Sequence, residues 1–190
     1  MTAEEVLAVL EETGAVCRGH FVLSSGLHSP VYVQCARVLQ YPKKAEQLAA
    51  ALCRTVTADK VGAVVAPALG GIVLGYELAR QLGARALFVE RGSSGQFELR
   101  RGFELAAGER VIVAEDVLTT GGSTRETLTV VRAAGAEVVG VAALVDRSGG
   151  RLVLDVPVWS LVRLELESYA AGECPQCRAG VPVEKPGSHP

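Results

Sequence analysis

The chain has 190 residues, of which 49% are hydrophobic and 21% charged, a globular composition that excludes a disordered chain. A formal net charge of −2, from 19 basic and 21 acidic residues, argues against a nucleic-acid or membrane-surface binder. The length predicts a single domain over 1–190. The acidic N-terminus is unlike a secretory signal, and Pro67 and glycines interrupt the long uncharged stretch 61–76. Five scattered cysteines favour a reduced, cytoplasmic setting.

The order of the predicted elements indicates the fold class. Apolar periodicity predicts helices over 3–12 and 43–56, with extended pieces and turns over 21–34 between them. From residue 61 onward, buried strands alternate with helices. Strands are predicted over 61–66, 86–89, 111–114 and 138–145, and helices over 72–82 and 122–134. This alternation is typical of right-handed βαβ units and predicts an α/β fold with a central parallel sheet flanked by helices.

Three other segments interrupt or follow this pattern. Residues 91–108 are polar, contain glycine and are rich in arginine, which predicts a mobile loop or a hairpin. The apolar run around Trp159 predicts a late strand. Residues 172–190 contain four prolines and three glycines and are expected to form an irregular tail.

The strongest chemical signal is VIVAEDVLTTGGST, at 111–124. A buried strand is followed by two adjacent carboxylates, Glu115 and Asp116, and by a Thr- and Gly-rich loop that opens the next helix. Glycines let backbone N–H groups approach an anion, hydroxyls add donors, and the helix N-terminus adds positive charge. In an open α/β sheet, ligands bind at the carboxyl ends of the strands. The loop therefore predicts a phosphate site.

The acidic pair beside this loop would repel a phosphate unless hydroxyls or a cation satisfied the carboxylates. A ribose offers two vicinal hydroxyls, and Mg²⁺ bound to the ligand would offset the charge, so we interpret the segment as a ribose-phosphate site. Ser123 and Glu126 also have capping-box spacing, so we expect Ser123 to cap the helix. Capping alone leaves the acidic pair and the double glycine unexplained. A Walker P-loop is excluded because its lysine is absent.

These residues resemble the signature for phosphoribosyl pyrophosphate (PRPP) in type I phosphoribosyltransferases. FVLSSGLHSPVYVQ (21–34) is similar to the hood segment of the members that use orotate. PALGGI (67–72) resembles the family's second phosphate-side loop, and LVDRSGG (144–150) its strand-end Asp-Arg. The resemblance implies the type I phosphoribosyltransferase fold. It implies a small N-terminal hood, mainly 15–40 plus a C-terminal segment, and a flexible loop over 91–103.

The resemblance also implies a glycosyltransferase that moves the phosphoribosyl group of PRPP to orotate, giving orotidine 5′-monophosphate and pyrophosphate in pyrimidine synthesis. Mg²⁺ is the implied cofactor, with no metal ligand among the site residues, and the implied assembly is a cytoplasmic homodimer whose loop is shared between subunits. PRPP binding is implied for Arg91, Glu115, Asp116, Val117, Leu118, Thr119, Thr120, Gly121, Gly122 and Ser123. Orotate binding is implied for Thr119 and Arg147, and catalysis for Glu115, Asp116 and Arg101.

The chain departs from the family pattern on the pyrophosphate side. Where the family usually has a lysine in the hood and in the PALGGI turn, this chain has Ser24 and Gly70. The flexible loop lacks its usual Lys and His. Because pyrophosphate needs positive charge, Arg91, Arg100 and Arg101 are the candidate replacements. Two alternatives remain open. A purine-type phosphoribosyltransferase would share the PRPP loop but not the hood, and a PRPP-sensing regulator would have lost catalysis.

The tail contains a CxxC pair, Cys174 and Cys177. Zinc requires four ligands, and only His189 lies near the pair in the sequence, so the missing local ligands argue against a zinc site within one chain. Two tails that pair in a dimer could assemble a site of four cysteines. His20 and His28 flank the hood, and because a lone histidine is more often structural, neither is given a role.

Overall fold

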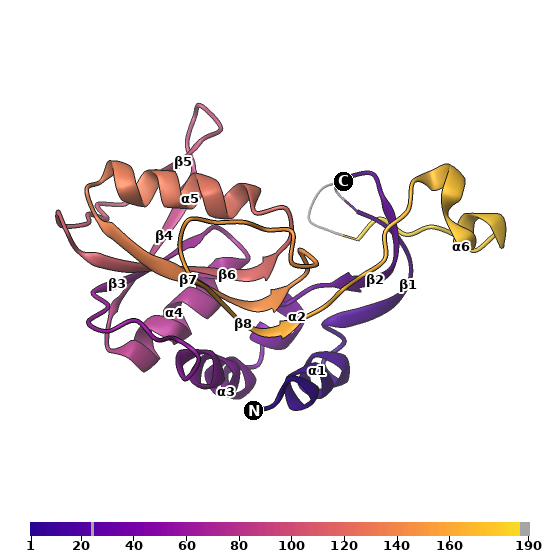
Figure 1. Cartoon of the computed structure of the whole chain (residues 1–190), viewed down its shortest axis with the longest axis horizontal. Coiled ribbons are helices and arrows are strands. Elements are labelled where there is room, and N and C mark those ends of the chain that lie inside the picture. The colour runs from indigo at the N-terminus through magenta and orange to yellow at the C-terminus, as the bar shows by residue number, and fades with distance from the viewer. Residues whose placement is uncertain (24, 187–190) are drawn as a thin grey trace.

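The computed structural model describes residues 1–23 and 25–186. A six-stranded sheet lies between helices on its two faces, and a two-stranded hairpin stands beside it at one end (Figure 1). The strands are β1 (Val16–Val22), β2 (His28–Val33), β3 (Ala63–Pro67), β4 (Arg85–Arg91), β5 (Phe97–Leu99), β6 (Arg110–Leu118), β7 (Glu137–Asp146) and β8 (Val158–Arg163). The predicted strands are confirmed, and the strand around Trp159 is β8.

The four predicted helices are confirmed with small differences at their ends, and a short helix at Ala36–Leu39 was not predicted. The helices are α1 (Ala3–Glu12), α2 (Ala36–Leu39), α3 (Pro42–Cys53), α4 (Gly71–Leu82), α5 (Gly122–Ala133) and α6 (Pro175–Arg178), with a 3₁₀ turn, η1 (Ala171–Glu173). The tail, predicted to be irregular, thus contains two short helical turns. In the part of the chain that is described, none of these helices has the length and apolar character needed to cross a bilayer.

The sheet has the strand order β5-β4-β3-β6-β7-β8. β3, β4, β6, β7 and β8 run parallel, as predicted, but β5 pairs antiparallel with β4, so the sheet is mixed. The added strand arises because residues 92–96 turn the chain back and let Phe97 pair with Arg91. The segment predicted as a loop or hairpin is therefore a hairpin at the sheet edge.

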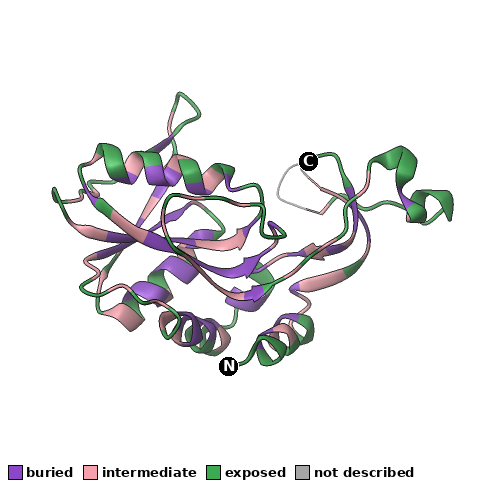
Figure 2. Cartoon of the chain, viewed as in Figure 1, coloured by how far each residue is buried: buried purple, intermediate pink, exposed green. Residues whose placement is uncertain are grey.

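Both faces of the sheet are buried, as its parallel connections require. Side chains alternate along each strand: Val64 and Ile112 belong to the apolar cluster that includes α3 and α4, whereas Val65 and Val113 belong to the cluster that includes α5. Figure 2 shows the buried residues concentrated in the strands and on the inward helix faces. Close packing of α4 depends on Gly75, where a Cβ would lie 2.9 Å from the Cβ of Ala66.

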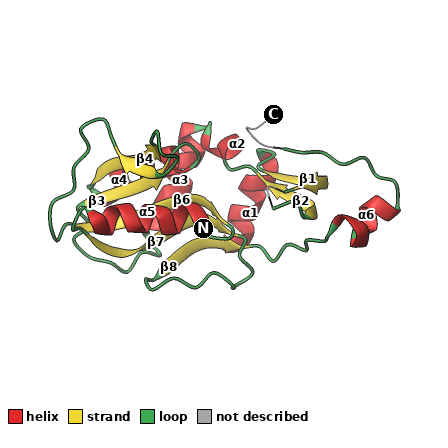
Figure 3. Ribbon diagram, turned by 90° about the horizontal axis from the view of Figure 1, so that it is seen from above, coloured by secondary structure: helices red, strands yellow, loops and turns green. Residues whose placement is uncertain are grey.

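The hairpin of β1 and β2 is joined to the C-terminal part of the chain. His28 pairs with Tyr169 in an antiparallel bridge, and Phe21 pairs with Glu184 in a parallel one. Figure 3 shows α6 beyond this hairpin, at the end of the molecule away from the sheet. Residues distant in sequence thus form one small unit beside the sheet.

Candidate active site

The two adjacent carboxylates lie inside a paired strand. β6 continues to Leu118 and stays in register with β7, with Glu115 opposite Ala143 and Val117 opposite Val145. The sequence placed Glu115 and Asp116 after the end of the strand, and this is wrong because the backbone pairing extends past both. The pairing with β7 supports this part of β6, whereas the pairing with β3 stops at Val113, so the carboxylates are positioned by one neighbouring strand before any ligand arrives.

Both carboxyl groups are short of hydrogen-bond donors. Burial, together with the neighbouring Asp116, raises the pKa of Glu115 to about 8. Burial also raises the pKa of Asp116, although the Val117 N–H, which donates to its Oδ1 at 2.9 Å, opposes the shift. Oε2 of Glu115 is buried and has no hydrogen-bond partner among the described residues. Such a pair is prepared for a ligand that brings hydroxyl donors or a cation.

The loop between β6 and α5 opens toward solvent. Its Gly121 has φ 77° and is the N-cap of α5. Any other residue would be strained there by the left-handed backbone, and its Cβ would also overlap Cδ1 of Leu152. The predicted cap by Ser123 and Glu126 is wrong: the left-handed Gly121 is the N-cap, two residues before Ser123, and no side chain of the described residues caps the helix.

This loop surrounds a hollow of about 330 Å³. The hollow is lined by the loop residues 119–124 together with Arg91, Glu115, Val117 and Glu126. Arg91 comes from the end of β4, lies 3.9 Å above the ring of Phe97 and donates to both carboxylate oxygens of Glu126. Open helix N–H groups, hydroxyls and an arginine make this hollow a site for an anion such as phosphate.

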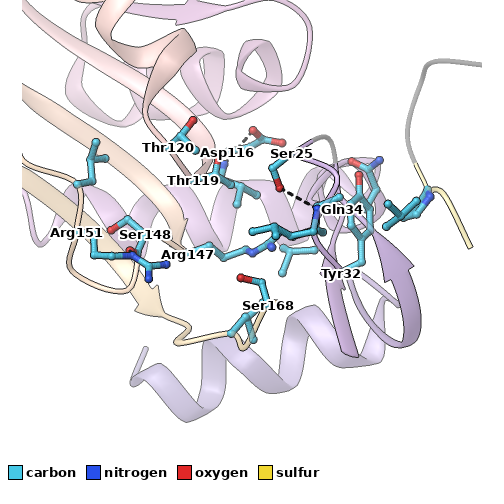
Figure 4. A pocket seen from close by; sticks show the side chains of 18 of the residues that line it. Ser25, Tyr32, Gln34, Asp116, Thr119, Thr120, Arg147, Ser148, Arg151 and Ser168 are labelled. Carbon is cyan, nitrogen blue, oxygen red and sulfur yellow. Dashed lines mark hydrogen bonds between the residues drawn. The ribbon is translucent and has the colours of Figure 1, made fainter. Parts of the chain in front are cut away.

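A second, larger pocket of about 700 Å³ adjoins the first. Its wall includes Asp116, Thr119 and Arg147 on the sheet side and Tyr32 on the hairpin side (Figure 4). Val117, Thr119 and Thr120 line both hollows, so one ligand can extend from the phosphate loop into the larger pocket.

Arg147 is one of three cationic residues that line the larger pocket in the described part of the chain, with Arg151 and Lys185. Its Nε is buried with no hydrogen-bond partner among the described residues, and burial lowers the pKa of its guanidinium. Burial also raises the pKa of Tyr32, whose hydroxyl faces the positive field of Arg147. A buried guanidinium without a partner is costly unless a ligand supplies an anion or hydrogen-bond acceptors. The pocket therefore suits a small anionic ligand with acceptors that match a planar guanidinium.

The other predicted cations do not reach these hollows. Arg101 has φ 59° and donates to Glu90 at 2.9 Å, with its guanidinium 5.7 Å from the ring of Phe88. Among the residues that are described, neither Arg100 nor Arg101 lines either hollow. The tight turn after β5 directs Arg101 back onto β4. Gly70 lies against the acidic pair, because a Cβ there would be 3.0 Å from Oδ2 of Asp116. Ser24 lies outside the described residues.

Sequence reasoning missed several pocket residues. Tyr32 and Gln34 line the larger pocket from the hairpin, and Lys185 lines it from the tail. The alternating pattern VYVQ, which puts residues 32 and 34 on the same side of an extended segment, could have identified the first two. No local pattern marks Lys185, since only the return of the tail to the hairpin brings it there.

Comparison with known proteins gives consistent matches. Residues 36–175 match the family model described as a phosphoribosyl transferase domain. The protein of Caldanaerobacter subterraneus subsp. tengcongensis named orotate phosphoribosyltransferase is 48% identical over 99% of this chain and 98% of its own length. The protein of Acidithiobacillus ferrooxidans with the same name is 50% identical, with coverage of 99% and 98%.

Solved structures agree with this match. The orotate phosphoribosyltransferase of Aeropyrum pernix superposes with a TM-score of 0.71 at 32% identity, over 87% of this chain and 94% of that one. The adenine phosphoribosyltransferase of Rhodothermus marinus superposes with a TM-score of 0.62 at 26% identity, over 83% and 99%.

Proposed function

The chain belongs to the phosphoribosyltransferase family, and from this premise we propose that it transfers the phosphoribosyl group of PRPP to orotate, giving orotidine 5′-monophosphate and pyrophosphate. The structural observation behind the proposal is that two hollows adjoin at the end of β6. One has the loop, hydroxyls and arginine that suit a phosphate, and the other contains Arg147, whose buried Nε has no hydrogen-bond partner among the described residues. PRPP and orotate are the two anionic substrates that this pair of sites accommodates.

The 5-phosphate of PRPP would lie in the loop hollow, where backbone N–H groups of α5 and the hydroxyls of Thr119, Thr120 and Ser123 donate to it. The ribose hydroxyls would donate to Glu115, whose Oε2 has no donor among the described residues, and to Asp116, whose Oδ1 accepts from the Val117 N–H. Binding in this mode would favour the ionised carboxyl groups.

Mg²⁺ is the expected companion of PRPP. The unpartnered Oε2 of Glu115 and the lack of a nearby cation among the described side chains, which leaves the pKa of both buried carboxyl groups raised, fit a PRPP that would arrive with its own cation beside Glu115 and Asp116. When bound, the ion would neutralise the pyrophosphate and make it a better leaving group. Arg91, at the rim of the hollow around the phosphate loop, adds a positive charge from this chain.

Orotate would lie in the larger pocket against Arg147 and Thr119. A planar guanidinium can donate paired hydrogen bonds to a carboxylate, and orotate has one carboxylate and two exocyclic oxygens. Tyr32, on the opposite wall, would limit the position of the ring. In this mode a ring nitrogen of orotate would lie beside C1 of the ribose.

The reaction requires little from side chains as acids or bases. As the bond between C1 and pyrophosphate breaks, the ribose gains oxocarbenium character, the orotate nitrogen forms the new bond to C1, and the proton of that nitrogen passes to the departing pyrophosphate. Glu115 and Asp116 stabilise that positive charge from the hydroxyl side, and Arg147 holds the nucleophile in line. Positioning and electrostatics are therefore the main contributions of the protein.

The active assembly in this proposal is a cytoplasmic homodimer. Of the described residues in 91–103, only Arg91 lines a hollow of its own chain, although PRPP brings a pyrophosphate that needs several cations. A second subunit could supply its loop to this side of the site. The scattered cysteines fit a reducing compartment.

An ultraviolet assay of orotate consumption tests the proposal, with purified protein, PRPP and Mg²⁺, and with adenine and hypoxanthine in parallel. We expect PRPP-dependent loss of orotate and no turnover of either purine. An Arg147→Ala preparation purified in the same way shows whether the activity belongs to this chain. Turnover of a purine alone would contradict the assignment to orotate. PRPP binding without turnover of any base would indicate a sensor.

A further inference from the structure

Four potential metal ligands converge at the end of the molecule away from the sheet. They come from both strands of the hairpin and from the start of α6, and they are His20, His28, Cys174 and Cys177. One ligand atom of each lies within 4.8 Å of the other three. Figure 1 shows α6 next to the hairpin, and none of the four lines either substrate hollow in the part of the chain described.

This cluster corrects the expectation that the CxxC pair lacks local ligands. His20 and His28 lie more than 140 residues before Cys174 in the sequence, but the bridge between His28 and Tyr169 brings the tail back to the hairpin. His189, the ligand considered from sequence, lies outside the described residues. The histidines without an assigned role and the unexplained cysteine pair belong to one site.

The distances between the ligand atoms fit tetrahedral coordination. Sγ of Cys177 lies 3.3 Å from Nδ1 of His28 and 3.6 Å from Nε2 of His20, and Sγ of Cys174 lies 3.4 Å from the same Nε2. Zinc bonds of about 2.0 Å to nitrogen and 2.3 Å to sulfur place N and S ligand atoms about 3.6 Å apart. The two imidazole nitrogens are 2.8 Å apart and would separate by about 0.5 Å around the ion.

The hydrogen bonding of His20 prepares it as a ligand. Its Nδ1 lies 2.8 Å from the carbonyl oxygen of Val181. A carbonyl only accepts, so Nδ1 holds the proton and the lone pair of Nε2 points at the cluster. Metal-binding histidines commonly have such a backbone acceptor on the far nitrogen, which fixes the tautomer and the ring orientation.

From this geometry we propose a structural zinc site within one chain, with four ligands: His20, His28, Cys174 and Cys177. Two imidazoles and two thiolates are donors that suit zinc, and two thiolates neutralise its charge. Four protein ligands leave no open position for substrate, as in structural rather than catalytic zinc sites. His20, His28 and Cys174 are buried, and Cys177 is exposed, which leaves an entry path for the ion.

The zinc would fix two walls of the larger pocket without touching a substrate. Beyond α6, the chain pairs with the hairpin: the N–H of Glu184 donates to His20 O at 2.7 Å, and the N–H of Val22 donates to Glu184 O at 2.8 Å. Lys185 follows directly and lines the pocket, as do Leu23 and Leu27 between the two histidines. The ion would therefore link the tail and the hairpin turn over the orotate side.

Elemental analysis of the full-length protein, purified without a metal-affinity step, tests the proposal. We expect one zinc per chain, lost in Cys174→Ser and in His20→Asn and retained in the control Cys53→Ser, since Cys53 lies on α3 away from the cluster. Cobalt added to the zinc-free, reduced wild-type protein is expected to give the intense visible absorption of tetrahedral, thiolate-ligated cobalt. This measurement does not depend on whether a variant folds.

Other outcomes would overturn the proposal. Wild-type protein without zinc, combined with no cobalt spectrum, shows that the cluster is only a hydrogen-bonded group. Zinc that is lost in Cys174→Ser but retained in His20→Asn and His28→Asn shows a site of four cysteines from two chains.

If the zinc site lies within one chain, removal of the zinc by a chelator lowers the thermal midpoint by at least about 5 °C and exposes residues 165–186 to proteolysis. This result does not depend on whether the chain uses orotate.

Discussion

Arg91 donates hydrogen bonds to both carboxylate oxygens of Glu126, inside the hollow that we assign to the phosphates of PRPP. Both side chains remain nearly half exposed, at 47% and 43%, so water screens the pair and its net contribution is small. A bound phosphate can therefore compete with Glu126 for the guanidinium. Glu126 holds Arg91 at the rim of the hollow until the ligand arrives.

Removing either member of this pair should change PRPP affinity in opposite directions. Arg91→Ala is expected to raise the KM for PRPP about 10-fold or more, because a charge-assisted contact to phosphate is lost. Glu126→Gln should lower that KM by about twofold to fivefold, since the competing carboxylate is gone. Steady-state kinetics with saturating orotate measures both. Glu137→Gln, which removes an ion pair with Arg110 far from the hollow, is the control. An unchanged KM in Arg91→Ala would remove Arg91 from the PRPP site.

The raised pKa of Glu115 predicts a specific pH dependence of stability. This pKa is about 8 in the folded protein, against an ordinary value of 4.5 for a glutamate side chain. The folded state therefore binds the extra proton between these values, and this stabilisation is complete below about pH 4.5 and is lost as the pH rises through about 8. Glu115→Gln removes the effect. Between pH 5 and pH 8 the free energy of unfolding of the variant should therefore rise by about 2–4 kcal/mol relative to that of the wild type.

Urea unfolding of the ligand-free protein at the two pH values measures this difference. The control Glu137→Gln changes an exposed carboxyl group at the start of β7. It should change the free energy of unfolding by a similar amount at both pH values. A Glu115→Gln variant with the same difference from wild type at pH 5 and pH 8 would show that the group is already ionised in the free protein.

The features of the fold and the site that the sequence predicted correctly are those that local sequence patterns determine. The βαβ order follows from short-range periodicity, and the phosphate loop follows from one continuous motif, so both are visible in adjacent residues. The cap of α5 was missed because Gly121 turns the backbone through a left-handed conformation that its letter alone does not require. Arg101 was placed in the site by motif position, but the turn after β5 directs it to Glu90. The His20–Cys174 contact has no local signal, because it depends on how the tail returns.

Arg147 should determine binding of the base. In Arg147→Ala, we expect kcat/KM for orotate to fall about 100-fold, because a guanidinium already desolvated for an anionic ligand is lost. The dissociation constant for PRPP should stay within about twofold, since the phosphate loop is not changed. Arg147→Lys should recover only part of the loss, because a single ammonium cannot donate paired hydrogen bonds. Arg132→Ala, which removes an exposed ion pair with Asp155, is the control. A loss of PRPP affinity as large as the loss in kcat/KM for orotate would indicate a general folding defect.

Gly70 should be required by the close approach of Asp116. Its backbone conformation, φ −58° and ψ −41°, suits any residue, so only the contact of a Cβ with the carboxyl group opposes substitution. Gly70→Ala should displace Asp116 by a few tenths of an ångström and raise the KM for PRPP about 10-fold. Gly70→Lys, which restores the residue usual in the family, meets the same contact and should not improve PRPP binding. Gly172→Ala is the matched control, because a Cβ there has no neighbour within 4 Å among the described residues. Normal kinetics in Gly70→Ala would show that Asp116 moves freely.

If Arg101 contacts pyrophosphate, it should do so in the active site of a second subunit. In its own chain it is bound to Glu90 and lies outside both hollows of the described structure. We expect Arg101→Ala and Asp116→Asn each to be nearly inactive as homodimers. When the two variants are mixed, unfolded and refolded together, half of the dimers are mixed and each has one intact site, so about one quarter of wild-type turnover should return. Such recovery requires that Arg101 and Asp116 of one site come from different chains. No recovery, with dimers present, would place Arg101 in the site of its own chain. Full activity in Arg101→Ala alone would exclude it from the reaction.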